Sequence, residues 1–113
     1  MLATFDGPAT ALRCAADIRR STARDGLQIR AGVHIGEVDF LEGDVRGIAV
    51  HEVARIAGEA VGDEILVSEV TRALASSSQL QFRTAGVRTL KGLPGEWELF
   101  EFIDDPVVTD SHL

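Results

Sequence analysis

Residues 27–36 constrain the fold most strongly, because they alternate strictly between two classes of side chain. The odd positions carry Leu, Ile, Ala, Val and Ile, whereas the even positions carry Gln, Arg, Gly, His and Gly. This alternation predicts a β-strand with one apolar face. On its other face, Gly32 and Gly36 leave room for something to approach the backbone. We expect residues 37–40 to continue the strand and residues 42–44 to form a turn.

Apolar residues at helical spacing flank this strand on both sides. The first helix is predicted to begin at an Asp6 N-cap, with Pro8 in its first turn, and to end near residue 25. Its apolar positions are Ala11, Leu12, Ala15 and Ile18. The second helix is predicted over residues 47–60. Its expected buried stripe consists of Val50, Val53, Ala54, Ala57 and Val61.

The second half of the chain contains three further strand signals and one helix signal. Residues 65–67 predict a short buried strand, after which Ser68 is placed to cap a helix over residues 69–75. Two more strands, at residues 80–90 and 97–102, are joined by a segment rich in Gly and Pro. These elements predict an α+β fold in which helices pack on one face of a mostly antiparallel sheet.

The size and charge of the chain disfavour several classes of protein. Its 113 residues suffice for one small domain, which we place at residues 1–103 with a flexible tail at residues 104–113. A formal net charge of -7 disfavours a nucleic-acid partner. No apolar run approaches the roughly 20 residues of a membrane span, and no signal-peptide pattern opens the chain. The single cysteine, Cys14, cannot form an intrachain disulfide, so a cytoplasmic protein is expected.

The second helix carries the most informative polar residues. His51 and Arg55 are four residues apart, so they project from the same side of the helix, beside its apolar stripe. A histidine and an arginine placed together at the edge of a core can bind an anion. The alternative is an ordinary solvated helix face, on which Glu52 pairs with a nearby arginine.

Two more side chains are candidates for ligand contacts. Lys91 precedes a glycine turn, from which its ammonium group can reach phosphate oxygens, and Asp44 can accept a hydrogen bond from an amino group. Either residue can equally be an ordinary surface side chain. His34, Cys14 and Trp97 are expected to have structural roles, with Cys14 and Trp97 in the core.

Four segments together resemble a known family. In order they read LATFDGP at residues 2–8, RAGVHIGEV at residues 30–38, GIAVHEVARI at residues 47–56 and LKGLPG at residues 90–95. This series resembles the C-terminal part of the class III adenylate/guanylate cyclase catalytic domain in its bacterial form. One segment alone is weak evidence, but four in this order, spread over residues 1–103, are specific.

The resemblance implies a fold, a reaction and an assembly. The family has a ferredoxin-like βαββαβ core and works as a head-to-tail dimer with its sites at the interface. Its adenylate cyclases convert ATP to cyclic AMP and pyrophosphate with Mg or Mn ions. The chain would then take part in cyclic nucleotide signalling, with ATP as its ligand and a second copy or another cyclase domain as its partner.

The resemblance also implies residue roles. Arg55 matches the arginine that stabilises the transition state, and Lys91 matches the lysine that holds the terminal phosphates. Asp44 matches the residue that accepts a hydrogen bond from the adenine amino group, which favours ATP. His51 stands where the family usually has an asparagine that positions the ribose, and its reach and tautomers differ from those of an amide.

The family's metal-binding aspartates and its base-recognising lysine lie upstream of the matched region. We therefore expect a cyclase fold truncated at its N-terminus, without metal ligands and inactive alone. One hypothesis is that the chain is the C-terminal part of an adenylate cyclase. The alternatives are a non-catalytic cyclase-like module for nucleotide binding or dimerisation, and an unrelated ferredoxin-like regulatory domain.

Overall fold

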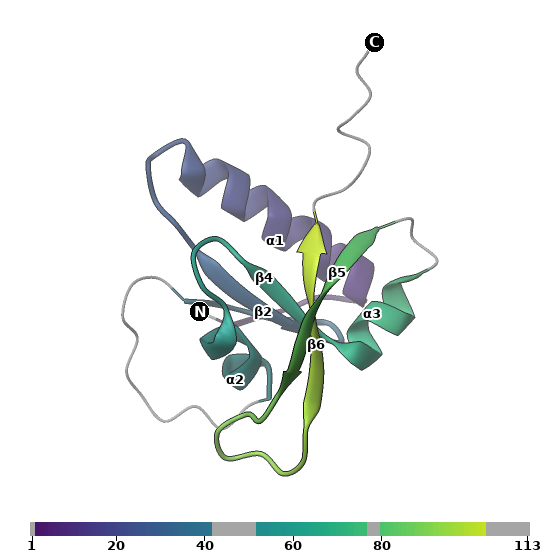
Figure 1. Cartoon of the computed structure of the whole chain (residues 1–113). Coiled ribbons are helices and arrows are strands. Elements are labelled where there is room, and N and C mark those ends of the chain that lie inside the picture. Colours follow the sequence, from purple (N-terminus) through teal and green to yellow (C-terminus); the bar gives the residue numbers. More distant parts are fainter. Residues whose placement is uncertain (1, 42–51, 77–79, 104–113) are drawn as a thin grey trace.

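The computed structural model describes residues 2–41, 52–76 and 80–103, and within them helices and strands alternate as an α+β fold (Figure 1). In chain order the elements are β1 (Leu2–Thr4), α1 (Pro8–Ala23), β2 (Arg30–His34), β3 (Glu37–Leu41), α2 (Glu52–Glu59), β4 (Ile65–Ser68), α3 (Glu69–Ala75), β5 (Gln81–Arg88) and β6 (Trp97–Ile103). None of the helices seen in these ranges is both long enough and apolar enough to cross a membrane.

The strands form one six-stranded sheet in the order β1-β3-β2-β4-β6-β5. The β2–β4 pair is parallel, whereas the other four neighbouring pairs are antiparallel. The prediction of a mostly antiparallel sheet is therefore confirmed. The parallel pair arises because α2 crosses over between β3 and β4 and returns the chain in the direction of β2.

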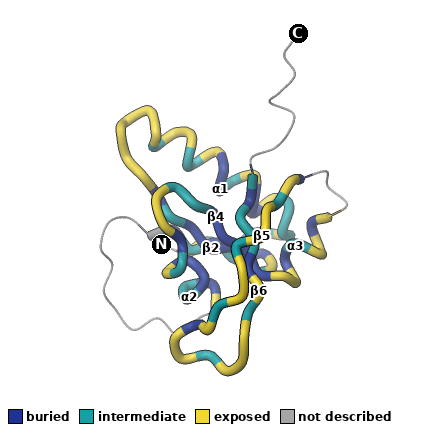
Figure 2. The backbone as a smooth tube through the Cα atoms, in the orientation of Figure 1, coloured by how far each residue is buried: buried dark blue, intermediate teal, exposed yellow. Residues whose placement is uncertain are grey.

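The helices cover both faces of this sheet, whereas the sequence analysis placed them on one face. Ile65 and Val67 of β4 belong to a buried cluster that includes residues of α1. Leu66 points the opposite way, into a second buried cluster with Ile56 of α2. Helices α1 and α2 therefore lie on different sides of β2 and β4 (Figure 1). The central strands β2 and β4, which lie between the helices of the two faces, are among the most deeply buried elements (Figure 2).

Strands β2 and β3 form a hairpin, so the expectation that residues 37–40 continue the first strand is wrong. The chain reverses at Ile35 and Gly36, and His34 pairs with Glu37. Ile35 takes a φ of 55°, which β-branched residues rarely adopt. The apolar positions change from odd to even numbers after residue 35, and this change of phase was the available signal for a hairpin.

Other local sequence patterns mostly predicted the helix caps and strand pairs correctly. Ser68 caps α3 as predicted, since its side chain accepts a hydrogen bond from the Thr71 backbone nitrogen. The two C-terminal strands pair as an antiparallel hairpin, β5–β6. Asp6 is not the N-cap of α1: that residue is Gly7, with Pro8 at the first helical position and no capping hydrogen bond from a side chain.

The buried face of α2 is rotated relative to its predicted stripe, because Ala54 is only half-buried and lines a hollow. Val53 and Ala57 are buried as expected, but Ile56 and Ala60 are buried too. Val61 was assigned to the stripe and is 66% exposed. The physical reason is that α2 ends at Glu59, so Val61 no longer follows the helical period. Val50 and the predicted tail at residues 104–113 lie outside the described residues.

Candidate functional site

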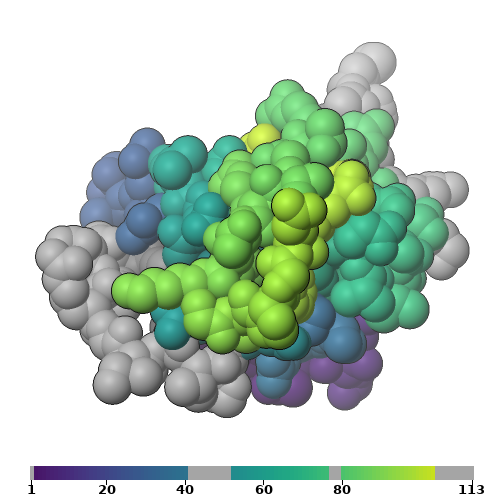
Figure 3. All heavy atoms as spheres, turned by 60° about the horizontal axis from the view of Figure 1, so that its bottom comes forward, coloured from purple at the N-terminus to yellow at the C-terminus, as the bar shows by residue number. Residues whose placement is uncertain are grey.

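Arg55 and Lys91, which the sequence placed in different elements, line the same hollow. This hollow has a volume of about 220 Å³, and its walls are Ala54, Arg55, Gly58, Glu59 and Lys91. It is lined by residues of α2 and by Lys91 of the β5–β6 turn. The β5–β6 hairpin lies at the front of the face drawn in Figure 3. Tertiary structure thus brings the two predicted phosphate-binding cations together.

A tight turn presents Lys91 to this hollow. The Leu90 carbonyl accepts a hydrogen bond of 3.0 Å from the Leu93 backbone nitrogen, and Gly92 between them has a φ of 82°. A positive φ at the third residue is the signature of a type II turn, which favours glycine there. The buried side chain of Leu90 anchors the turn, so the Lys91 backbone is held at its corner.

The Arg55 side chain extends from α2 to this same turn. A Cβ atom added to Gly92 would lie 3.6 Å from Arg55 Nη2, so the guanidinium group rests against the glycine backbone. Within residues 2–41, 52–76 and 80–103, no hydrogen bond or ion pair engages Arg55 or Lys91. No described residue therefore competes with a bound anion for these two cations. A guanidinium group offers a planar fork of donors, and an ammonium group offers a compact charge.

The other two predicted site residues, Asp44 and His51, lie outside the described residues. Glu52 is the first residue of α2, and its partner within the described residues is a histidine. Its carboxylate oxygen Oε1 lies 2.9 Å from Nε2 of His34. Among the described residues, the partner of Glu52 is therefore this histidine; Arg46, a nearby arginine, lies outside them.

The glycine face of β2 is covered by the protein itself. A Cβ atom at Gly32 would lie 2.4 Å from the Ala57 nitrogen and 2.7 Å from the Val53 carbonyl oxygen. The room that the sequence left beside this strand is thus filled by the backbone of α2. Helix α2, and with it Arg55, is seated directly on the central strand.

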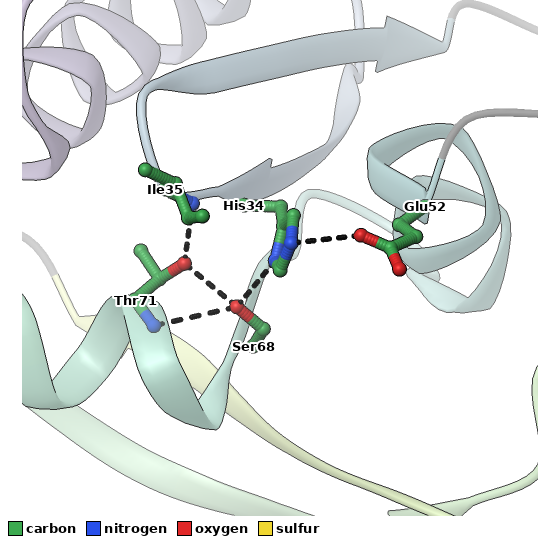
Figure 4. A network of polar contacts seen from close by, with 5 residues as sticks. All are labelled: His34, Ile35, Glu52, Ser68 and Thr71. Atoms are coloured by element: carbon green, nitrogen blue, oxygen red, sulfur yellow. Dashed lines mark hydrogen bonds and ion pairs between the residues drawn. The ribbon is translucent and has the colours of Figure 1, made fainter. Parts of the chain in front are cut away.

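His34 joins α2 to a buried polar network (Figure 4). Its Nδ1 atom lies 2.9 Å from Ser68 Oγ, and Ser68 Oγ lies 2.6 Å from Thr71 Oγ1. Thr71 Oγ1 also accepts a hydrogen bond of 2.6 Å from the Ile35 backbone nitrogen. Ser68 and Thr71 are 1% and 0% exposed, so these hydroxyls depend on one another for partners.

One arrangement of protons satisfies every group in this network. The Glu52 carboxylate only accepts hydrogen bonds, so His34 Nε2 carries the hydrogen that faces it. In the neutral ring, Nδ1 then accepts from the Ser68 hydroxyl, and Ser68 accepts from the Thr71 hydroxyl. His34 therefore fixes the start of α2 to the start of α3, which is the structural role expected of it.

Two other expectations concern single residues in the core. Cys14 is half-buried rather than fully enclosed. Trp97 is also half-buried and packs against the second buried cluster, which contains Ile56 and Leu66. Its ring meets the His34 ring edge-on, with 5.9 Å between the ring centroids.

A larger hollow, of about 440 Å³, lies beside His34 between the β2–β3 turn and the start of α1. Asp6, Glu37 and Glu52 contribute acidic side chains to its wall. Even so, no three His, Cys, Asp or Glu side chains within the described ranges are grouped as ligands for one metal ion. We therefore assign no metal ligand among the described residues.

Glu59 and Arg88 are two charged residues that sequence reasoning missed. Glu59 lines the hollow with Arg55 and Lys91, and Arg88 of β5 forms an ion pair with it. The spacing of four residues between Arg55 and Glu59 was visible in the sequence. The contact with Arg88 was not, because it depends on the packing of β5 near the end of α2.

Comparison with known proteins gives matches among solved structures. No family model matches the chain, and no curated protein matches it significantly. A crystal structure of an adenylate/guanylate cyclase/hydrolase from Silicibacter pomeroyi superimposes with a TM-score of 0.66 and 27% identity, over 89% of this chain and 64% of that one. The adenylyl cyclase CyaB from P. aeruginosa superimposes with a TM-score of 0.56 and 21% identity, over 85% of this chain and 55% of that one. The chain thus spans less than two thirds of either structure's length.

Proposed function

We propose that this chain, which has the class III adenylate/guanylate cyclase fold, supplies the phosphate-binding cations of an adenylate cyclase site. The observation that carries the proposal is the shared hollow of Arg55 and Lys91. In the proposed reaction the ribose 3′-oxygen of ATP attacks the α-phosphorus. The new oxygen–phosphorus bond closes cyclic AMP, and the bond to pyrophosphate breaks.

Each cation is suited to a different part of this reaction. We assign Arg55 to the negative charge that develops on the phosphates as the bond to pyrophosphate breaks. Its fork of donors can contact two oxygens at once, and its placement against Gly92 limits reorganisation during the reaction. We assign Lys91 to the terminal phosphates, for which a point charge at the corner of a fixed turn is sufficient.

The preference for ATP rests on Asp44, and the ribose contact on His51; both residues lie outside the described ranges. We assign Asp44 to the adenine amino group, because a carboxylate accepts hydrogen bonds and cannot donate them when ionised. We assign His51 to the ribose, where a neutral imidazole has one donor and one acceptor. The support for both roles is the match of residues 47–56 and their surroundings to the cyclase motifs.

We assign no ligand for the family's Mg or Mn ions among the described residues, where no group of three or more His, Cys, Asp or Glu side chains could hold a metal ion. The proposed roles are therefore limited to binding phosphate and offsetting its charge. We expect no measurable cyclic AMP from the chain alone, and activity only when another cyclase domain supplies the metal ligands. That partner would be a second cyclase domain docked head to tail, and self-association as a homodimer is expected by the same resemblance.

A binding experiment tests the site directly. Calorimetric titration of the purified chain with ATP should detect binding that Arg55→Ala or Lys91→Ala weakens by about tenfold or more, the usual effect of losing one charged hydrogen bond. Arg83→Ala is the matched control, since Arg83 pairs with Glu101 on the exposed face of the β5–β6 hairpin. Equal affinities for the Arg55→Ala and Arg83→Ala chains would overturn the assignment.

A complementation assay separates an enzyme fragment from a binding module. The partner is a class III cyclase domain whose own arginine, equivalent to Arg55, has been replaced. Loss of such a contact typically lowers the rate by about 10²–10³. Adding this chain should restore part of the cyclic AMP formation, and adding its Arg55→Ala variant should not. ATP binding without any restored activity would instead favour the alternative function, a non-catalytic nucleotide-binding or dimerisation module.

A further inference from the structure

The Arg55–Lys91 hollow contains a negative charge as well as two positive ones. Glu59 lies in its wall, four residues after Arg55 on α2. Opposite charges at this spacing face each other on a helix and commonly pair. A Glu59–Arg55 pair would occupy the guanidinium that the proposed function needs for phosphate.

The structure gives Glu59 a different partner. Arg88 Nη1 donates to Glu59 Oε1 over 3.1 Å and lies 3.4 Å from the Glu59 carbonyl oxygen. The Glu59 carboxylate is thereby turned toward β5. Arg55, in contrast, has no such partner among the described residues and rests against Gly92.

Arg88 is itself held firmly. Its Nη2 donates to the Ala85 carbonyl oxygen over 2.8 Å, so its guanidinium group spans β5 and the end of α2. The side chains of Arg88 and Glu59 are 33% and 34% exposed, so water screens this pair less than it would a fully exposed one. Arg88 does not line the hollow where an anion would bind, whereas its partner Glu59 does.

We propose that Arg88 is a positioning residue for the anion site: by pairing with Glu59, it keeps that carboxylate away from Arg55 and leaves both cations to a polyphosphate. This inference rests on the proposed function, because it assumes that the hollow binds phosphate groups. Without Arg88, Glu59 would turn toward Arg55, and the hollow would lose one positive charge. Without Glu59, Arg88 would have no carboxylate to restrain, and this positioning role would disappear.

The test is a cycle of two substitutions, with inorganic tripolyphosphate as the probe. We expect Arg88→Met to weaken tripolyphosphate binding by about fivefold, the upper end for one partly exposed ion pair. Glu59→Gln should bind at least as tightly as the unchanged chain. The Arg88→Met/Glu59→Gln double variant should return to within about 1.5-fold of the unchanged chain. Arg83→Met, which breaks an ion pair remote from the hollow, should leave binding unchanged.

The outcomes separate the possible failures. If Arg88→Met binds normally, or if the double variant binds as weakly as Arg88→Met, Arg88 does not act by restraining Glu59. A merely structural role would give that second result, because the double variant also lacks the ion pair. If Arg88→Met fails to fold, Glu59→Gln still decides, since weakened binding by this variant would overturn the inference. If Arg55→Ala binds tripolyphosphate as well as the unchanged chain, the proposed phosphate site itself is wrong.

Discussion

Replacing Gly32 with alanine tests whether the backbone of α2 sits directly on β2. The added Cβ would lie 2.4 Å from the Ala57 nitrogen and 2.8 Å from the Ala57 Cα. Ordinary contacts between such atoms begin near about 3.4 Å, so α2 would have to move away by roughly 1 Å. The obstructing atoms are backbone, and no change of side-chain rotamer can relieve the clash.

This substitution should lower the free energy of unfolding substantially. Overpacking a core typically costs about 1–3 kcal/mol, and a clash with helix backbone belongs at the upper end. We therefore expect a loss of about 3 kcal/mol. In a domain of this size that loss corresponds to a fall in Tm of roughly 12 °C or more.

Equilibrium unfolding in urea measures the effect, followed by the fluorescence of the single tryptophan, Trp97. Gly58→Ala is the matched control in α2, because a Cβ atom there meets nothing within 4 Å. It should raise the free energy of unfolding by about 0.5–1 kcal/mol, since alanine is the better helix former. If Gly32→Ala were as stable as the unchanged chain, the close seating of α2 on β2 would be refuted.

Three smaller changes test the turns and the buried network. Thr71→Val should lower the free energy of unfolding by about 1–3 kcal/mol, because the Ile35 nitrogen and the Ser68 hydroxyl would both lose a partner; an unchanged urea midpoint would show that the network contributes nothing. Ile35→Gly should raise the free energy of unfolding by about 1 kcal/mol, because the φ of 55° is strained for isoleucine but not for glycine; a lower thermal midpoint would contradict this. Gly92→Ala should lower the free energy of unfolding by about 1 kcal/mol in the same urea titration, since the φ of Gly92 is 82°. It should leave tripolyphosphate affinity unchanged, because the added Cβ would only touch Arg55 at 3.6 Å. A large loss of affinity would mean that this turn tolerates no added atom beneath the guanidinium.

Several features of the protein followed from the sequence alone. The stripe in α1, the Ser68 cap of α3 and the β5–β6 hairpin each depend on residues close together in the chain. The motif order gave the cyclase resemblance, which the solved structures confirm at the level of the fold. The identities of Arg55 and Lys91 as candidates came from those same motifs.

The errors in the sequence reading occur where distant contacts override a local pattern. Residues 27–36 alternate as one strand, and the change of phase after residue 35 is a short signal that the predicted extension to residue 40 ignored. The chain reverses there, where Ile35 has a positive φ and its backbone nitrogen donates to Thr71. Asp6 is a good capping residue by type, but the chain enters α1 through Gly7. In each case the local preference differs by about 1 kcal/mol, which tertiary packing readily outweighs.

The charge arrangement of the candidate site was decided by the tertiary structure alone. Sequence spacing favours Glu59 as the partner of Arg55, because both lie on one helix face. Packing places Arg88 of β5 within 3.1 Å of Glu59 instead and sets the Arg55 guanidinium group against Gly92. Residue types thus determined which charges the protein carries. The approach of β5 and the β5–β6 turn to α2 determined which of them are paired, because electrostatic attraction depends on distances that only the folded chain sets.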